Sequence, residues 1–462
     1  MLLPYSFVKQ HKVLYIENYL YITELTNIKI LTEVNRFGII APIKNITLEE
    51  FEEKLSIYYS QSNVSNINAD INDTIDLSKL VQEIPVIDDL LETENDAPII
   101  KMINTLLTQA IRDGASDVHI EASEKKSCVR FRIDGVLRDI VNIPSALHVI
   151  VISRLKIMAN LDIAEKRQPQ DGRIGIKVAG KNIDIRLSSL PTAYGERIVM
   201  RLLERNLNNL NLNKLGMNSD ILTNFNKLLN LPHGILLVTG PTGSGKTTSL
   251  YAGIRNLDAQ KVNILTVEDP IEYELPNINQ TQVNNKIDLS FAKVLRSILR
   301  QDPDVIMIGE IRDIETAQIA IQASLTGHLV LATLHTNNAP SAITRLIDMG
   351  IEPFLLSSTI SGILAQRLVR KLCTTCKELK NGTWQAIGCD KCNNTGYLGR
   401  TGIHELLIVD ETMRSHIHAN ASELVIQNYA KSCGMLSMME DGQKLVQAGI
   451  TSIQEVARVC RE

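Results

Sequence analysis

Hydrophobic residues recur at helical spacing in "APIIKMINTLLTQAIRDG", which begins at Ala97. They fall on one face of a helix, which Gly114 is placed to end. The pattern changes in "CVRFRIDGVLRDI", where apolar and polar residues alternate. Successive side chains of a strand point to opposite faces, so this alternation predicts a half-buried hairpin that turns at Asp134-Gly135.

The strand-like runs "DVHIE", "NIDIRLSSLPT" and "ERIVMRLL" lie on either side of this hairpin. Together with the helix they predict one α+β domain over residues 97–205. Arg130 and Arg132 lie two positions apart, so a strand places both on its polar face. A solvated strand face is the simplest explanation of such alternating charges.

The pattern of hydrophobic and polar residues predicts a smaller unit over the first 60 residues. "VLYIENYLYITEL" predicts strand, turn and strand, and "TLEEFEEKLSIYYS" predicts a helix. We therefore expect a small N-terminal α/β domain over residues 1–60. Residues 61–96 are rich in Asn, Ser and Asp and have little to bury, which predicts a linker.

Short continuous apolar runs dominate residues 206–462, among them "GILLVTG", "VNILTV", "DVIMIG" and "HLVLATL". Runs of this length and composition are typical of strands buried on both faces of a parallel sheet. The third domain is therefore predicted to be an α/β domain built on such a sheet.

The motif "GPTGSGKTT" follows the first of these runs and precedes a helical pattern. It matches G-x-x-x-x-G-K-[ST], in which backbone N–H groups surround phosphate oxygens at a helix N-terminus. In this motif the lysine reaches the β- and γ-phosphates and the Thr247 hydroxyl binds magnesium. The predicted nucleotide-binding residues are Gly240, Pro241, Thr242, Gly243, Ser244, Gly245, Lys246, Thr247 and Thr248.

Polar residues follow three later apolar runs: Glu268, Glu310 and His335. Ligands of open parallel sheets bind at the carboxyl ends of the strands, the edge where the Gly-rich loop lies. We predict that Glu310 activates or holds the attacking water and that Glu268 and His335 assist. A solvated carboxylate at a strand end and a structural histidine are the alternatives.

The amino-acid composition argues against some classes of protein. The 462 residues are 44% hydrophobic and 22% charged, with a net charge of −4 and only 1 Trp and 7 Phe. An acidic chain with few aromatic residues is unlike a general nucleic-acid binder, so no nucleic-acid partner is expected. No signal peptide or membrane span is evident, which predicts a cytosolic protein with reduced thiols.

Four of the 7 cysteines lie in "LCTTCKELKNGTWQAIGCDKC". Two C-x-x-C pairs at this spacing predict a tetrahedral zinc site formed by Cys373, Cys376, Cys389 and Cys392. A disulfide clasp, a redox pair and unliganded loop cysteines are the alternatives. Four ligands leave no open position, so the zinc of a sub-domain at about residues 371–398 would be structural.

"GPTGSGKTTSLYA", "VEDPIEY", "DPDVIMIGEIRD" and "GHLVLATLHTN" resemble the Walker A, Asp box, Walker B and His box of the GspE/PilB family of secretion ATPases. The resemblance extends over residues 80–462. It implies a RecA-like P-loop ATPase domain with a zinc sub-domain, preceded by a PAS-like α+β domain. It also implies ATP, magnesium and zinc as cofactors, and that Arg130, Arg132 and Arg173 approach the nucleotide.

The resemblance further implies a homohexamer on the cytoplasmic face of an inner membrane. The N-terminal domain would dock there on an integral-membrane protein that is GspL-like, with a GspF-like protein as a second candidate. The expected function is the motor of type II secretion, which drives pseudopilus assembly. A type IV pilus extension or competence ATPase, a nucleic-acid translocase with a zinc knuckle, and a non-hydrolysing scaffold are the alternatives.

Overall fold

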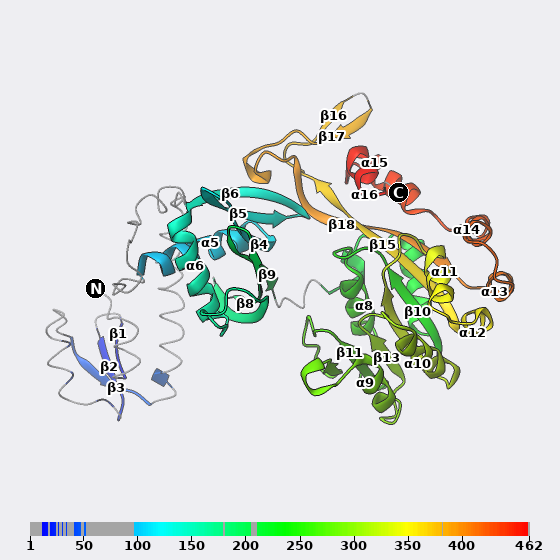
Figure 1. The fold of residues 1–462 in the computed structure, drawn as a ribbon, viewed down its shortest axis with the longest axis horizontal. Coiled ribbons are helices and arrows are strands. Elements are labelled where there is room, and N and C mark those ends of the chain that lie inside the picture. The colour runs from blue at the N-terminus through cyan, green and yellow to red at the C-terminus, as the bar shows by residue number, and fades with distance from the viewer. Residues whose placement is uncertain are drawn as a thin grey trace. The chain divides into compact units, whose positions relative to one another are not determined.

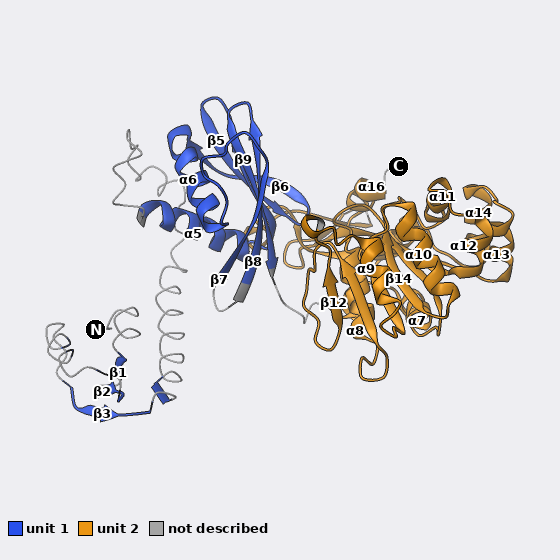
Figure 2. Ribbon diagram, turned by 60° about the horizontal axis from the view of Figure 1, so that its bottom comes forward, with its two compact units in different colours: residues 1–205 blue, residues 206–462 orange. Residues whose placement is uncertain are grey.

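The computed structural model describes residues 97–178, 181–204, 210–380 and 382–460, together with parts of 12–51. The predicted linker and most of the helix predicted before it lie outside these residues. The chain divides into two compact units, residues 1–205 and 206–462 (Figure 2). Within the described part of the chain, no helix has the length and apolar character needed to cross a membrane.

A three-stranded sheet is described near the N-terminus (Figure 1). Strands β1 (Val13–Ile16) and β2 (Tyr19–Ile22) pair antiparallel, and β3 (Ile43–Asn45) pairs parallel to β2. This confirms the predicted strand–turn–strand. Val13 and Leu14 are fully buried and form a small core with Phe51.

Six antiparallel strands form the main sheet of the first unit, in the order β6-β5-β4-β9-β8-β7. The elements are α5 (Ala97–Arg112), β4 (Ala115–Ala122), β5 (Lys126–Ile133), β6 (Val136–Pro144), α6 (Ser145–Met158), β7 (Gln170–Val178), β8 (Lys181–Thr192) and β9 (Gly195–Glu204). The predicted hairpin is β5–β6. Its turn residues Asp134 and Gly135 have φ of 49° and 82°, as a two-residue hairpin turn requires.

Helices α5 and α6 pack on one face of this sheet (Figure 2). The alternate residues of the strands that face them, such as Val129 and Phe131, are fully buried. The residues between them point to the other face, which no described helix of this unit covers. One face is therefore core and the other is polar, and Arg130 and Arg132 lie on the polar face.

The second unit is built on a seven-stranded sheet in the order β12-β11-β13-β14-β10-β15-β18. Its strands are β10 (Gly234–Thr239), β11 (Ile264–Glu268), β12 (Asn279–Gln282), β13 (Val305–Ile308), β14 (Leu329–Leu334), β15 (Ile360–Leu372) and β18 (Tyr397–Ile408). All pair parallel except β18, which pairs antiparallel to β15. The predicted parallel α/β sheet is confirmed.

Helices cover both faces of this sheet (Figure 1). The helices are α7 (Ser219–Leu229), α8 (Lys246–Arg255), α9 (Phe291–Ile298), α10 (Ile314–Leu325), α11 (Pro340–Asp348), α12 (Pro353–Thr359), α13 (Glu411–His418), α14 (Glu423–Ser432), α15 (Met438–Gln447) and α16 (Ile453–Cys460). Leu236 packs in the core with α7 and α8, whereas its neighbour Ile235 packs in the core with α9 to α13. Both faces of this sheet are therefore core, and the polar residues predicted for the site lie at or after the ends of strands.

Candidate functional site

The Gly-rich loop leaves the carboxyl end of β10 and enters α8. Gly240, Gly243 and Gly245 have φ of 146°, 78° and 88°, a region that other residues rarely adopt. A Cβ on Gly240 would lie 2.4 Å from the backbone oxygen of Gln366, so a side chain is excluded there. This geometry is that of a P-loop, with Thr247 and Thr248 half-buried on the first turn of α8.

Lys246 folds back onto its own loop. Its Nζ donates to the carbonyl oxygens of Gly240 at 2.8 Å and Pro241 at 3.1 Å, and lies 3.5 Å from His335 Nδ1. Burial lowers the pKa of Lys246 to about 8, against the opposing effect of the Glu310 carboxylate. A phosphate group would replace the carbonyl partners and stabilise the charged lysine.

Glu310 and His335 meet beside this lysine. His335 Nε2 lies 3.6 Å from Glu310 Oε2, and Glu310 Oε1 pairs with Arg312. Burial, and then the nearby Lys246, lower the pKa of His335, so the ring is neutral near pH 7. Lys246, Glu310 and His335, which follow different strands, are thus brought together at one edge of the sheet.

The sequence analysis missed Arg312 and assigned no role to Asp269. Arg312 pairs with Glu310 and also lies 3.9 Å from Asp269. Asp269 directly follows β11 and Arg312 lies two residues after Glu310, so both belong to the same row of strand ends. Their spacing from the predicted carboxylates could have identified them.

Glu268 is placed differently from the other predicted residues. It is 2% exposed, and its Oε1 accepts hydrogen bonds from Thr266 Oγ1 at 2.5 Å and Gln280 Nε2 at 3.0 Å. Its Oε2 accepts a hydrogen bond from the Tyr251 hydroxyl. Both oxygens are therefore engaged in a buried network that joins α8, β11 and β12, and a role of Glu268 at the metal or water stays a prediction.

The polar face of the first unit carries rows of charged residues. The pairing register aligns one row across the sheet: Arg173, Arg186, Arg201, Asp117 and Arg132. Arg201 Nε lies 3.0 Å and Arg132 Nε 3.6 Å from the Asp117 carboxylate, whereas Arg173 is exposed. Arg186 and Arg201 were missed, although they occupy alternate positions in predicted strands.

Arg130 lies in the neighbouring row. It binds both oxygens of Glu121, at 2.8 and 2.6 Å, and Arg197 also lies 2.8 Å from Glu121. Carboxylates of β4 thus hold arginines of β5 and β9. Arginines outnumber carboxylates in these two rows of the face, and such a face attracts anions.

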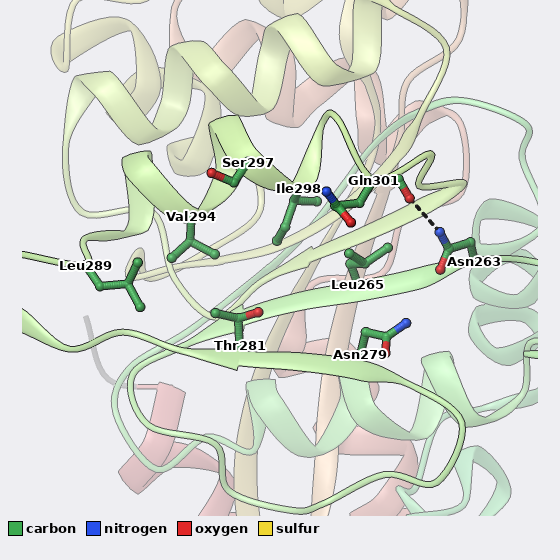
Figure 3. A pocket seen from close by; sticks show the side chains of 9 residues that line it. All are labelled: Asn263, Leu265, Asn279, Thr281, Leu289, Val294, Ser297, Ile298 and Gln301. Atoms are coloured by element: carbon green, nitrogen blue, oxygen red, sulfur yellow. Dashed lines mark hydrogen bonds between the residues drawn. The ribbon is translucent and has the colours of Figure 1, made fainter.

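A cavity of about 570 Å³ lies at the β12 edge of the seven-stranded sheet (Figure 3). It is lined by Asn263, Leu265, Asn279, Thr281, Leu289, Val294, Ser297, Ile298 and Gln301. The outermost strand β12 forms one side of the cavity. Strands β11, β13 and β14 lie between β12 and β10, the strand that leads into the Gly-rich loop. The cavity is therefore distinct from the P-loop edge.

The four predicted cysteines converge between β15 and β18. Their sulfur atoms all lie within 4.8 Å of one another, with pairs at 3.7 and 3.8 Å. Tetrahedral zinc with bonds of about 2.3 Å places its sulfurs about 3.8 Å apart, so the geometry fits zinc.

Backbone groups prepare this cluster for a metal. Although burial opposes it, N–H donors from Cys389 and Gly396 lower the pKa of Cys392 to about 6. This favours the thiolate at Cys392, whereas burial raises the pKa of Cys376 to about 12, so a metal that binds there must displace the Cys376 proton. The structure places none of the seven cysteines in a disulfide bond.

The fold and the P-loop edge together define a RecA-like P-loop ATPase. Residues 92–458 match the family described as "Type II/IV secretion system protein", and residues 2–59 match an N-terminal domain of the family described as "GSPII protein E". The chain belongs to the type II/IV secretion system protein family.

Curated relatives cover nearly the whole chain. It is 55% identical to the type II secretion system protein HxcR of Pseudomonas aeruginosa, over 94% of this chain and 92% of that protein. It is 52% identical to the type II secretion system ATPase E of Vibrio cholerae, over 89% and 86%. The chain is thus a secretion ATPase.

Solved structures support the fold. The pilus retraction motor PilT with bound ADP aligns with a TM-score of 0.56 at 29% identity, over 78% of this chain and 97% of that one. The ATPase DotB of Legionella pneumophila aligns with a TM-score of 0.60 at 22% identity, over 78% and 95%.

Proposed function

We propose that this chain is the motor ATPase of a type II protein secretion system and couples Mg-ATP hydrolysis to pseudopilus assembly. The observation that carries the proposal is the convergence of Lys246, Glu310 and His335 at one sheet edge. The relatives named as type II secretion proteins match the chain over nearly its whole length and supply the cellular context.

In this proposal Lys246 exchanges its carbonyl partners for the β- and γ-phosphates. The Thr247 hydroxyl holds magnesium, which supplies charge neutralisation when bound. Glu310 orients and deprotonates the attacking water. Neutral His335, which accepts from Lys246 at Nδ1, carries its proton on Nε2 towards Glu310 and so keeps that carboxylate beside the γ-phosphate.

The arginines of the first unit complete the proposal. Arg130, Arg132 and Arg173 lie on the face of the first unit's sheet that no described helix of that unit covers, and we assign them to the phosphates of ATP. Hydrolysis then depends on the position of that unit, which couples chemistry to movement.

Assembly and location are part of the same proposal. We assign the chain to a homohexamer on the cytoplasmic face of the inner membrane. Residues 2–59, which match the N-terminal domain of the GSPII protein E family, would dock on a GspL-like or GspF-like membrane protein. The Cys373–Cys392 segment would hold structural zinc, as its sulfur spacing favours.

The test is Glu310→Gln in the full chain. We expect ATP affinity to stay within threefold of wild type because the P-loop is untouched, and kcat to fall at least about 10²-fold because the charged base is lost. Calorimetric binding and a steady-state ATPase assay measure the two effects. Near wild-type turnover would remove Glu310 from the reaction.

Complementation separates the two secretion-related functions. The wild-type gene should restore secretion to a strain that lacks its type II ATPase, and Glu310→Gln should not. Restoration of twitching in a strain without its pilus extension ATPase, but not of secretion, would favour the type IV pilus alternative.

A further inference from the structure

Gln366 is a polar residue in an apolar row. It lies on β15, where its same-face neighbours Leu364 and Leu368 are hydrophobic, and it is only 2% exposed. Burying an amide in such a place costs free energy unless both ends are hydrogen-bonded. A leucine would fill the row without that cost, so the amide calls for an explanation.

Both ends of the Gln366 amide are bound to the nucleotide edge. Its Nε2 donates to the backbone oxygen of Ser244 at 2.7 Å, and its Oε1 accepts from Ser249 Oγ at 2.6 Å. Ser244 belongs to the P-loop, and Ser249 lies on the helix that the P-loop opens. One side chain thus joins the loop and the helix to the neighbouring strand.

The bond to Ser244 fixes the direction of a peptide group. The C=O and N–H of a trans peptide point in opposite directions, so a Ser244 carbonyl held by Gln366 turns the Gly245 N–H away from β15. A Cβ on Gly245 would lie 2.8 Å from Gln366 Nε2, so this approach also needs glycine. In a P-loop such N–H groups point at the phosphates.

We propose that Gln366 is a positioning residue for nucleotide binding. It holds the Ser244–Gly245 peptide in the orientation that aims its N–H at a phosphate of the bound nucleotide. This inference rests on the proposed ATPase site and assigns to that site a residue 122 positions away from Ser244 in the chain.

The cross-strand neighbour of Gln366 does not compete for its amide group. Its cross-strand neighbour is His404, whose ring nitrogens make no hydrogen bond to the described residues. Burial lowers the pKa of His404 to about 4, so this ring stays neutral and unchanged between pH 6 and 8.

The experiment measures ADP and ATP affinity by calorimetry and kcat and KM by ATPase assay, all on the full chain. Gln366→Leu removes both hydrogen bonds at similar volume. We expect Kd for ADP and ATP, and KM, to rise at least fivefold with kcat within threefold, because binding is lost equally in ground and transition states. A merely structural role would lower kcat through misfolded protein and leave KM unchanged.

Two further variants identify the bond that matters. Ser249→Ala removes only the helix bond and should raise Kd less than threefold. Gln366→Glu cannot donate when ionised, but its protonated acid can donate to the Ser244 oxygen. The ratio of its Kd to the wild-type Kd should therefore fall from pH 8 to pH 6. Lys246 titrates in both proteins, so its effect cancels in this ratio.

The exposed Gln322→Leu on α10 controls for the substitution. A rise in Kd below fivefold in folded Gln366→Leu overturns the inference, as does a loss of kcat at unchanged KM. If Gln366→Leu does not fold, a Gln366→Glu affinity without pH dependence overturns it. Failure of wild type to bind ADP or ATP would instead refute the proposed function itself.

Discussion

The two large sheets of this protein carry functional residues in different places. The six-stranded antiparallel sheet is covered by helices on one face, and its arginines lie across the other face. The seven-stranded sheet is covered on both faces, and its predicted nucleotide-binding and catalytic residues lie at or after the ends of strands, whereas Gln366 is buried within β15. The covering of a sheet therefore determines where its chemistry can be exposed.

This difference also explains how rigidly the strand-end residues of one sheet and the arginines of the other are held. Lys246 and Glu310 follow strands that are buried on both faces, so the backbone around them is fixed by the core. The arginines extend from an exposed face and depend on carboxylates of the adjacent strand for their orientation. We expect mutations at the strand ends to have larger effects than mutations on the exposed face.

The largest effect of a mutation is expected in the cysteine segment, which lies outside the two large sheets. Cys389→Ser should lose zinc and unfold the segment between β15 and β18, because zinc contributes on the order of 10 kcal/mol to folding in small modules. Metal analysis under reducing conditions should give one zinc for wild type and none for the variant, and ADP affinity should persist. The exposed Cys433→Ser is the control, and a variant that retains zinc would contradict the site.

Lys246→Ala tests the strand-end site. It removes the charge that faces the phosphates, so ATP affinity and turnover should each fall on the order of 10²-fold or more. Calorimetry and an ATPase assay measure the two. Lys444→Ala, at an exposed position of α15, should behave as wild type. Retained turnover in Lys246→Ala would mean that this edge is not the reaction site.

Arg130→Ala with Arg132→Ala tests the exposed face. The fold should persist, because Arg197 and Arg201 remain within 2.8 and 3.0 Å of the carboxylates that these arginines leave. Turnover should fall at least about tenfold, with a smaller loss of ATP affinity.

Arg138→Ala is the matched control for the arginine pair. Arg138 pairs in register with Phe131, a core residue, and so belongs to the opposite face of the same sheet. Equal losses of turnover in Arg138→Ala and the double variant would remove any special role of the polar face. Unchanged turnover in an assembled double variant would return Arg130 and Arg132 to a solvated surface.

The smallest effect concerns pH. The pKa of Lys246 is about 8 without nucleotide and should return towards its ordinary value beside phosphates. Binding therefore takes up a proton above pH 8, and Kd for ADP should rise with pH, by about fivefold between pH 8 and 9. Lys246→Arg stays charged and should show a flat profile over the same range. A flat wild-type profile would contradict the low pKa.

Local patterns in the sequence were enough to predict much of this fold. The Asp134-Gly135 hairpin, the buried strands and the P-loop each depend on residues close together in the chain. The meeting of Glu310 with His335 also followed, because parallel strands end at one edge.

Side-chain direction could not be predicted in the same way. Glu268 follows the same strand pattern as Glu310, but its carboxylate turns into a buried network with Tyr251. Gln366 lies 117 residues from its partner Ser249, so no local pattern links them. Such contacts depend on which strands become neighbours, which periodicity does not specify.

The antiparallel pairing of β15 and β18 extends to Leu372 and Tyr397, at the base of the cysteine segment. The chain therefore leaves and re-enters the sheet at two adjacent points, and residues 373–396 form a detour between them. A short turn or a foreign module could bridge the same two points without changing the path of the remaining strands. This position offers a graft site for a reporter or an affinity module in the full chain.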